Sequence, residues 1–408
     1  MVRNILFLTL SRIEKLDTEG IYLDLVKALA SNGFHLYVVT PREKRFGLST
    51  ELLHSGNIHL LKVKTGNITK TNFIEKGITT LFIQRQYLKA INIFFKDTHF
   101  DLLMFSTPPI TFEKVVQYFK HRHKCIVYLM LKDIFPQNAV DLGLIKKNSI
   151  IYKYFRKKEK KIYAFSDYIG CMSPANMSFI IKNNPEIDEN KVELFPNTIQ
   201  VKPRDTKTST FIFRKKFNIP NDAVLFIFGG NLGIPQGIDF LLDCLDEMRN
   251  FNKAYFLIVG DGTEKERIKK KAINLNLKNV VFEDQMEKED YRQILLECDV
   301  GLILLDKRFT IPNYPSRILS YMDMSLPILA ATDRASDIKD LLKEAECGLW
   351  SYSDDKQDFI KNIKYLCENK NLRIKMGQNG RKYLEQNFDI SRSVNIIKSH
   401  LKFEDKID

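Results

Sequence analysis

The feature that most constrains the fold is a regular alternation of short apolar runs with amphipathic helical segments. In the first half, β-branched or aromatic runs occur at residues 5–8, 35–40, 102–105, 125–131 and 168–172. In the second half, such runs occur at residues 223–228, 254–259, 280–282, 300–305 and 328–331. Strands that alternate with helices indicate an α/β architecture, and near-continuous apolar strands indicate parallel sheets covered on both faces. The sequence therefore predicts an α/β protein built on parallel sheets.

Two domains of similar architecture are expected from the length and from one break in the pattern. The chain has 408 residues, which is more than one hydrophobic core normally serves. The polar stretch 201–210, VKPRDTKTST, separates the two sets of strands and is predicted to be a linker. We expect a first domain over residues 1–200 and a second over 201–388. A C-terminal amphipathic helix within 389–408 is expected to pack back toward the first domain.

Composition excludes several classes of protein. The apolar fraction of 44% and the charged fraction of 28% are typical of a soluble globular chain. The longest apolar runs are too short to span a bilayer, and the N-terminus lacks the cleavage site of a signal peptide. The six cysteines form no CxxC pair and have no His cluster near them, so they are expected to be buried free thiols. We expect a cytoplasmic protein without a metal site.

Excess positive charge is concentrated in the first half. Residues 1–205 hold 31 Lys and Arg against 19 Asp and Glu, whereas residues 206–408 hold 32 against 31. A basic half indicates nucleic acid or an anionic membrane surface as a partner, and it is also compatible with an ordinary solvated surface.

A glycine-rich turn follows the first strand of the second half. Residues 226–237 read FIFGGNLGIPQG, in which Gly229, Gly230, Asn231 and Gly233 connect a strand to a helix. Glycines at such a turn let backbone N–H groups approach a phosphate closely, and the following helix N-terminus adds partial positive charge. The spacing differs from the dinucleotide fingerprint GxGxxG. An ordinary tight turn is the alternative.

A second glycine turn ends the next strand. Residues 259–262 read VGDG, and Gly260 and Gly262 precede a charged helical segment. Ligands of α/β sheets bind at the carboxyl ends of the strands, so two such turns in one domain predict a binding crevice there.

The third motif contains the strongest candidate cation. Residues 313–327 read NYPSRILSYMDMSLP, and Pro315 and Ser316 are expected at the start of a helix. Arg317 then lies in its first turn. A guanidinium can fork onto two phosphate oxygens, which suits a diphosphate; a solvated surface arginine is the alternative.

These motifs occur in an order that resembles a known family. GGNLGIPQG, IVGDGTEKERIKK, CDVGLILL, YPSRILSYMDMSLPILA and MGQNGRKYLEQNF follow one another as in glycosyltransferase family 4, over nearly the whole second half. Within that family the chain most resembles the fucosaminyltransferase-like enzymes of O-antigen and capsule assembly. The resemblance implies the retaining GT-B fold, in which two Rossmann-like parallel-sheet domains face each other across a cleft. It places the nucleotide-sugar donor, a UDP-sugar, on the second domain.

The sequence departs from that family at two pairs of positions. Where many members have two Glu residues eight apart, this chain has Pro312 and Ser320. Where many have an Arg and a Lys on the donor diphosphate, it has Ile234 and Gln236. The resemblance thus leaves Arg317 as the main cation on the diphosphate. Secondary help is expected from Lys307 or Arg308, and Ser320 is expected to contact the ribose weakly.

Two loops of the first half are candidates for the same cleft. Residues 17–22, DTEGIY, retain Gly20 of a loop that is glycine-rich in the family, and a helix-start turn explains Gly20 equally well. Residues 131–143 read LKDIFPQNAVDLG, which places Asp133 just after an apolar strand. Asp133 is the best acidic candidate for orienting the sugar or stabilising positive charge at the anomeric carbon, with a helix cap as the alternative.

A basic segment follows that loop. Residues 145–165 contain one acid, Glu159, and a predicted apolar helical stripe formed by Ile151, Tyr154, Phe155 and Ile162. The segment's eight cations are Lys146, Lys147, Lys153, Arg156, Lys157, Lys158, Lys160 and Lys161. Basic helices with aromatic side chains bind anionic lipid, and no nucleic-acid recognition motif accompanies this one. A helix packed on the core is the alternative. The family's acceptors are often lipid-linked sugars at the inner membrane face, which favours lipid.

The resemblance implies sugar transfer with retention at the anomeric carbon. Arg317 and the glycine turns would stabilise the leaving diphosphate, Asp133 would act at the sugar, and an acceptor hydroxyl would be the nucleophile. No tightly bound cofactor or metal is expected. Three alternatives stay open: a UDP-sugar 2-epimerase of the same fold, a catalytically inactive binding or scaffold protein, and a nucleic-acid-binding protein, which only the net charge favours.

Overall fold

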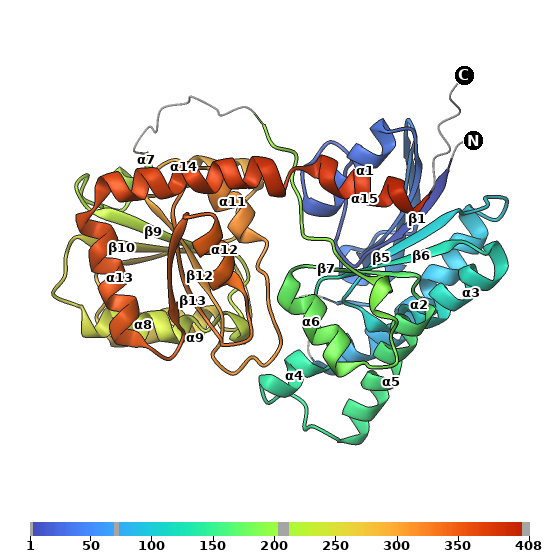
Figure 1. Cartoon of the computed structure of the whole chain (residues 1–408), viewed down its shortest axis with the longest axis horizontal. Coiled ribbons are helices and arrows are strands. Elements are labelled where there is room, and N and C mark those ends of the chain that lie inside the picture. Colours follow the sequence, from blue (N-terminus) through green and yellow to red (C-terminus); the bar gives the residue numbers. More distant parts are fainter. Residues whose placement is uncertain (1–2, 69–72, 203–211, 402–408) are drawn as a thin grey trace. The chain divides into compact units, whose positions relative to one another are not determined.

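The computed structural model describes residues 3–68, 73–202 and 212–401, and it divides the chain into two compact units. Unit 1 contains Met1–Gln200 and Ile390–Asp408, and unit 2 contains Val201–Asp389 (Figure 1). The chain therefore leaves unit 1 once and returns to it with its last helix, α15 (Ile390–His400). Of the predicted linker 201–210, residues 203–210 lie outside the described part of the chain.

Unit 1 contains an eight-stranded sheet in the order β3-β4-β2-β1-β5-β6-β7-β8. Neighbouring strands are parallel, with the exception of the antiparallel hairpin formed by β3 and β4. The strands are β1 (Asn4–Leu8), β2 (His35–Glu43), β3 (Glu51–Ser55), β4 (Ile58–Thr65), β5 (Leu102–Ser106), β6 (Ile126–Leu131), β7 (Tyr168–Cys171) and β8 (Val192–Leu194).

Helices cover both faces of this sheet (Figure 1). α1 and α15 contact each other, and their apolar residues share one core with Ile5, Phe7 and other inward residues of the strands. In another layer α3 contacts both α2 and α5, and α3 and α5 contact β6. The helices are α1 (Ile21–Ser31), α2 (Phe73–Phe94), α3 (Glu113–His123), α4 (Gln137–Asp141), α5 (Ile150–Phe165), α6 (Pro174–Asn183) and α15.

Unit 2 contains a six-stranded sheet in which every neighbouring pair is parallel, in the order β11-β10-β9-β12-β13-β14. The strands β9, β12 and β13 are buried throughout, which explains why they read as uninterrupted apolar runs. The strands are β9 (Val224–Gly229), β10 (Ala254–Val259), β11 (Val280–Glu283), β12 (Val300–Leu304), β13 (Ile328–Thr332) and β14 (Gly348–Tyr352).

The helices of unit 2 also form two groups. α8 contacts α9 and α13, and apolar residues of all three enter one core with the strands. α11 packs against the long helix α14. The helices are α7 (Ile212–Lys216), α8 (Ile238–Glu247), α9 (Lys265–Asn274), α10 (Lys288–Leu295), α11 (Arg317–Asp323), α12 (Ile338–Glu344), α13 (Lys356–Glu368) and α14 (Lys370–Asn387).

Both predicted sheets are confirmed, and each contains strands that the sequence pattern did not predict. β3 and β4 form a hairpin in which charged residues such as Lys62 interrupt the apolar pattern. β8 and β14 are edge strands with few buried residues, which weakens the apolar signal. Within the described residues, no helix combines the length and the apolar character needed to cross a bilayer.

Candidate active site

The two glycine turns predicted in unit 2 are locked together at the carboxyl edge of its sheet. The N–H of Gly230 donates to the carbonyl of Val259 over 2.9 Å, and the N–H of Leu232 donates to the carbonyl of Asp261 over 2.9 Å. A Cβ atom on Gly260 would lie 1.9 Å from the carbonyl oxygen of Gly230, and the φ of Gly260 is +149°. Only glycine fits there, because a side chain would force the two turns apart.

The locking limits which N–H groups of these turns can donate to a ligand, and their contact with phosphate stays a prediction. The N–H groups of Gly230, Gly260 and Gly262 donate to acceptors within unit 2, so they are not available to a ligand. The N–H groups of Asn231 and Gly233 have no acceptor among the described residues. Of the predicted glycine loop, these two positions therefore retain the capacity to donate.

Arg317 lies over the first turn. It is the first residue of α11, after Pro315 and the N-cap residue Ser316, as predicted. Its guanidinium lies 4.3 Å above the ring of Phe228, and a Cβ on Gly230 would lie 3.3 Å from its Nη2 atom. Nη2 also donates to Oε1 of Gln236 over 2.6 Å. The structure thus brings Gly230, Gly260, Gln236 and Arg317 together from separate segments.

One donor of this guanidinium is unsatisfied. Nη1 of Arg317 is buried and has no hydrogen-bond partner among the described residues. Burial lowers the pKa of Arg317 from its usual value, because the charged form loses hydration. An anion placed at Nη1 would supply the missing acceptor and offset the lost hydration, since leaving a buried donor unpaired costs roughly 1–3 kcal/mol.

Sequence reasoning missed the side chains that hold this arginine. Phe228 lies at the end of β9, and its aromatic face supports the guanidinium. The hydroxyl of Tyr321 accepts from the N–H of Gly229 over 3.2 Å and donates to the carbonyl of Ile227 over 3.1 Å, which fixes α11 against β9. Both read as core aromatics in the sequence. Ser320 lies in α11, three residues after Arg317.

The other proposed cations differ from Arg317. Arg308 is tied to Asp306 by two hydrogen bonds of 2.8 Å, so its charge is already paired. A pocket of about 470 Å³ opens on the α8 side of the first turn, and its lining includes Gly233, Arg308 and Lys307. Arg317 does not line it. We assign the candidate site to Arg317 and the locked turns because the unsatisfied donor is there.

Asp133 occupies the corresponding edge of the unit 1 sheet, two residues beyond β6. Both its carboxylate oxygens accept from Nδ2 of Asn138, over 2.9 and 2.8 Å. Asp133 does not cap a helix, because α4 begins after Pro136. Burial raises the pKa of Asp133 to about 6 against the opposing effect of these hydrogen bonds. At neutral pH Asp133 is therefore mostly ionised, and a modest fall in pH, to about 6, protonates half of it.

Lys132, beside it, was missed as a site residue. Its Nζ lies 3.2 Å from the carbonyl oxygen of Phe195 and 3.2 Å from the sulfur of Met172, and no carboxylate pairs with it among the described residues. Burial lowers the pKa of Lys132 to about 7. The hydroxyl of Thr107 accepts from the backbone N–H of Lys132 and donates to the carbonyl of Asp133, so it fixes this strand end.

Gly20 is the N-cap residue of α1. Its N–H donates to the carboxylate of Asp24 over 3.2 Å, and its carbonyl accepts from the N–H of Asp24 over 2.7 Å. The φ of 172° is extended backbone that any residue adopts. Gly20 therefore lies in the turn that starts α1, and its contact with a ligand stays a prediction.

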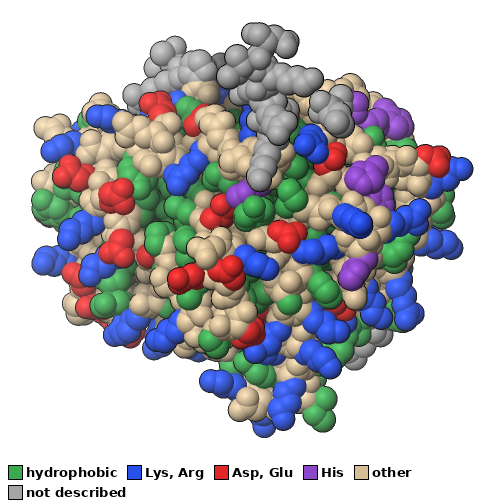
Figure 2. Space-filling model, turned by 45° about the vertical axis from the view of Figure 1, so that its right-hand side comes forward, with side chains coloured by type: hydrophobic (Ala, Val, Ile, Leu, Met, Phe, Trp, Pro, Cys, Tyr) green, Lys and Arg blue, Asp and Glu red, His purple; other side chains and the backbone are tan. Residues whose placement is uncertain are grey.

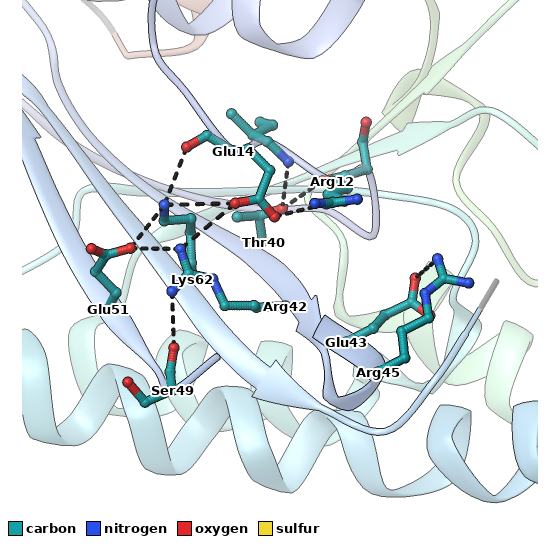
Figure 3. Close-up of polar contacts among 11 residues, drawn as sticks. Arg12, Glu14, Thr40, Arg42, Glu43, Arg45, Ser49, Glu51 and Lys62 are labelled. Carbon is teal, nitrogen blue, oxygen red and sulfur yellow. Dashed lines mark hydrogen bonds and ion pairs between the residues drawn. The ribbon is translucent and has the colours of Figure 1, made fainter. Parts of the chain in front are cut away.

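A cluster of charges around two buried cations, also unpredicted, fixes the loop that precedes Gly20 (Figure 3). The largely buried side chains of Arg42 and Lys62 both pair with Glu51, with Lys62 at 2.9 Å. Nζ of Lys62 donates to the carbonyl of Glu14 over 3.1 Å, and Arg42 lies 3.6 Å from the Glu14 carboxylate. The hydrogen bonds from Lys62 and Arg42 lower the pKa of Glu51. These pairs tie the segment after β1 to β2, β3 and β4.

The basic segment forms α5, but its apolar stripe is only partly as expected. Ile162 is buried, whereas Ile151 and Tyr154 are exposed. Glu159 is buried and pairs with Arg156 over 2.6 Å. The helix thus packs by one edge and presents apolar as well as basic side chains to solvent. No group of three or more His, Cys, Asp or Glu side chains placed to hold a metal ion occurs in the described part of the chain.

Comparison with known proteins gives the fold and the class of domain. Residues 209–383 match the family described as Glycosyl transferases group 1. The probable glycosyltransferase WbjE of Pseudomonas aeruginosa is 24% identical over 304 residues, which cover 73% of this chain and 74% of that protein. The putative colanic acid biosynthesis glycosyl transferase WcaI of Escherichia coli is 24% identical over 27% of this chain and 26% of that protein.

Solved structures agree over nearly the whole chain. Sucrose-phosphate synthase from Thermosynechococcus elongatus superposes with a TM-score of 0.77 at 16% identity, covering 98% of both chains. WaaG, a glycosyltransferase involved in lipopolysaccharide biosynthesis, gives 0.69 at 14% identity over 96% of this chain and 99% of WaaG. The predicted GT-B fold is confirmed. Residues 209–383 form a glycosyl transferases group 1 domain, and the chain is a transferase enzyme.

Proposed function

We propose that this enzyme transfers a sugar from a nucleotide-diphosphate donor, a UDP-sugar, with retention of anomeric configuration. The observation that carries the proposal is the buried, unpartnered Nη1 of Arg317 beside the two locked glycine turns. The site suits the leaving diphosphate, on which negative charge grows as the bond to the sugar breaks. Anabaena HepE, whose structure superposes with a TM-score of 0.69 at 15% identity over 98% of this chain and 99% of HepE, was solved with UDP-glucose.

In the proposed reaction the acceptor hydroxyl attacks the anomeric carbon as the bond to the donor phosphate breaks. A phosphate oxygen takes the hydroxyl proton, so the products are a glycoside and a nucleoside diphosphate. Arg317 stabilises the departing phosphate, and the N–H groups of Asn231 and Gly233 donate to it. Asp133 orients the sugar or stabilises positive charge at the anomeric carbon. Ser320 contacts the ribose. No metal is required, because Arg317 supplies the positive charge.

We also propose that the acceptor is a lipid-linked or soluble saccharide of bacterial surface polysaccharide assembly, such as O-antigen or capsule. The descriptions of WcaI, for colanic acid biosynthesis, and of WaaG, for lipopolysaccharide biosynthesis, support this proposal. The motif order supports a family 4 enzyme of the fucosaminyltransferase-like branch. The enzyme would then work in the cytoplasm at the inner face of the membrane, with the segment from Lys146 to Lys161 on the anionic lipid surface.

The test is release of nucleoside diphosphate from a panel of UDP- and GDP-sugars, with a membrane lipid extract as the acceptor source. We expect one donor to be consumed, and Arg317→Ala to lower its turnover roughly 100- to 1,000-fold, as expected for loss of one donor that stabilises the transition state. Arg308→Ala is the matched control, because Arg308 is already paired with Asp306. Turnover of no donor, or equal turnover by Arg317→Ala and the wild type, would overturn the proposal.

A further inference from the structure

The layer formed by α2, α3 and α5 presents a surface of one charge. Residues 79–94 of α2 hold two Lys or Arg, α3 holds three and α5 holds six. The same stretches contain only two acids, Glu113 and Glu159, which are 2% and 4% exposed. Each is paired within the layer, with Lys158 and Arg156 respectively. A third acid, Glu75 in the first turn of α2, pairs with Lys44 outside the layer. The outer side of residues 79–94, α3 and α5 is therefore cationic. We call this side, together with residues 144–149 before α5, the cationic face.

Many cations of this face are unpaired. Exposed side chains without an acidic partner among the described residues are Arg85, Lys89, Lys114, Arg122, Lys146, Lys147, Lys153, Lys157 and Lys161. Lys120 and Lys160 are paired instead, with Asp167 and Glu186. A protein normally intersperses charges of both signs, so a row of unpaired cations over three adjacent helices indicates a polyanionic partner.

Large apolar side chains stand among these cations. Ile150 is 87% exposed and Ile151 is 57% exposed at the start of α5, and Leu144 and Tyr154 flank them. On α2, Phe82 and Ile93 are 50% and 58% exposed. Figure 2 shows green apolar atoms beside blue Lys and Arg atoms in its lower part, at the height where Figure 1 places α4 and α5. Such exposure costs solvation unless an apolar phase receives the side chains.

A groove of about 610 Å³ runs between α2 and α3 on the same face, and Leu88, Lys114, Tyr118, His121 and Arg122 are among its lining residues. Arg122 donates to the hydroxyl of Tyr118, which donates to Oδ1 of Asn92 over 3.1 Å. This chain of hydrogen bonds joins the two helices and holds the guanidinium at the groove. Two cations beside an apolar wall suit a phosphate that is attached to a hydrocarbon chain.

We propose that the cationic face binds an anionic lipid bilayer, with a lipid phosphate in the α2–α3 groove and Ile150 and Ile151 in the interface. Nucleic acid fits less well, because exposed aliphatic side chains would gain nothing from a phosphate backbone. The proposal extends the predicted contact from α5 to all three helices. Binding to lipid itself needs neither a sugar donor nor an acceptor. The proposal rests on the proposed function only in its explanation of why the enzyme binds lipid, which is access to a lipid-linked acceptor.

The experiment is co-sedimentation of the full chain with phosphatidylcholine vesicles that contain either 30% phosphatidylglycerol or none. The first variant is Ile150→Ser with Ile151→Ser, and the second is Lys114→Ser with Arg122→Ser. The matched control is Ile374→Ser with Lys375→Ser, two exposed residues of α14 in unit 2. All variants change exposed residues, and their circular dichroism and melting temperatures are compared with the wild type.

We expect binding to anionic vesicles only, weakened by salt, because each cation near such a surface contributes about fivefold to the affinity. The affinity of both test variants for anionic vesicles should fall at least tenfold, and the control should bind as the wild type does. Equal binding to both vesicle types, binding to neither, or an equal loss in the control would overturn the proposal. Binding to single-stranded DNA at least as tight as to vesicles, and unaffected by the isoleucine substitutions, would overturn it in favour of nucleic acid. Loss of vesicle binding with normal turnover of a soluble acceptor would leave the proposed function standing.

Discussion

The carboxyl edges of the two sheets are built in different ways. In unit 2 the edge is mostly backbone: two turns are locked together by glycines such as Gly260, and one arginine lies over them. In unit 1 the edge is made of side chains, with Lys132 and Asp133 in positions where burial shifts both pKa values toward neutrality. Under the proposed function, unit 2 would hold the donor diphosphate with a permanently charged arginine, and unit 1 would supply groups that titrate near neutral pH.

A substitution at Gly260 tests the backbone-built edge of unit 2 and should have the largest effect. Gly260→Ala would place a methyl group 1.9 Å from the carbonyl oxygen of Gly230, at a φ of +149°. We expect a loss of roughly 3 kcal/mol in the free energy of unfolding from overpacking and strain, with loss of donor turnover. Urea unfolding measures the first effect. Gly20→Ala is the control, because nothing lies within 4 Å of its Cβ position. Equal losses in the two variants would show that the locked turns are not special.

The pH dependence of turnover tests the role of Asp133 at the edge of the unit 1 sheet. The pKa of Asp133 is about 6 and the carboxylate is the proposed active form, so kcat/KM should rise with pH through about 6 and then level off. Asp133→Asn should remove this limb and lower the plateau roughly 100-fold. The measurement is a pH profile of donor turnover from pH 5 to 8.5. A limb that persists in Asp133→Asn would assign it to another group.

The third prediction concerns Lys132 and is the smallest. Its pKa falls from 10.5 in the unfolded chain to about 7 in the folded protein, so the unfolded state binds more protons between these values. Wild-type stability should therefore rise with pH above about 7, by roughly 1 kcal/mol per pH unit at most. In Lys132→Met the free energy of unfolding, measured with urea at pH 7.5 and 8.5, should change less with pH than in the wild type. Lys361→Met, at an exposed position of α13, should leave it unchanged.

The same contrast explains what the sequence predicted. The α/β class, both parallel sheets and the placement of Arg317 at a helix start follow from local patterns, because glycine turns and helix starts have short-range signatures. Phe228 and Tyr321 were missed, since their contacts join segments far apart in the sequence. Asn138 lies only five residues from Asp133, but no local motif marked it as a partner. Hairpin β3–β4 was missed because charges interrupt its apolar pattern, and those charges form the cluster around Arg42 and Lys62.

Phosphate contacts were predicted for the glycine loop as a whole, and they stay a prediction; the structure shows only which of its N–H groups already have acceptors. The N–H groups of Gly230 and Gly260 hold the turns to neighbouring strands, a use that appears only when strand order is known. Spacing alone did not distinguish an N–H that locks a turn from one that is available to a ligand. The charge excess of the first half was visible, but its concentration on α2, α3 and α5 required the packing of these helices.

In the proposed binding mode, the nucleoside diphosphate binds unit 2 through Arg317, without help from Asp133. The most direct measurement is calorimetric titration of UDP into the wild type, Arg317→Gln and Asp133→Asn. We expect a dissociation constant at least tenfold larger for Arg317→Gln, because the unpartnered Nη1 loses its phosphate. For Asp133→Asn this binding mode predicts the wild-type affinity. Unchanged affinity in Arg317→Gln, or an equal loss in both variants, would contradict it.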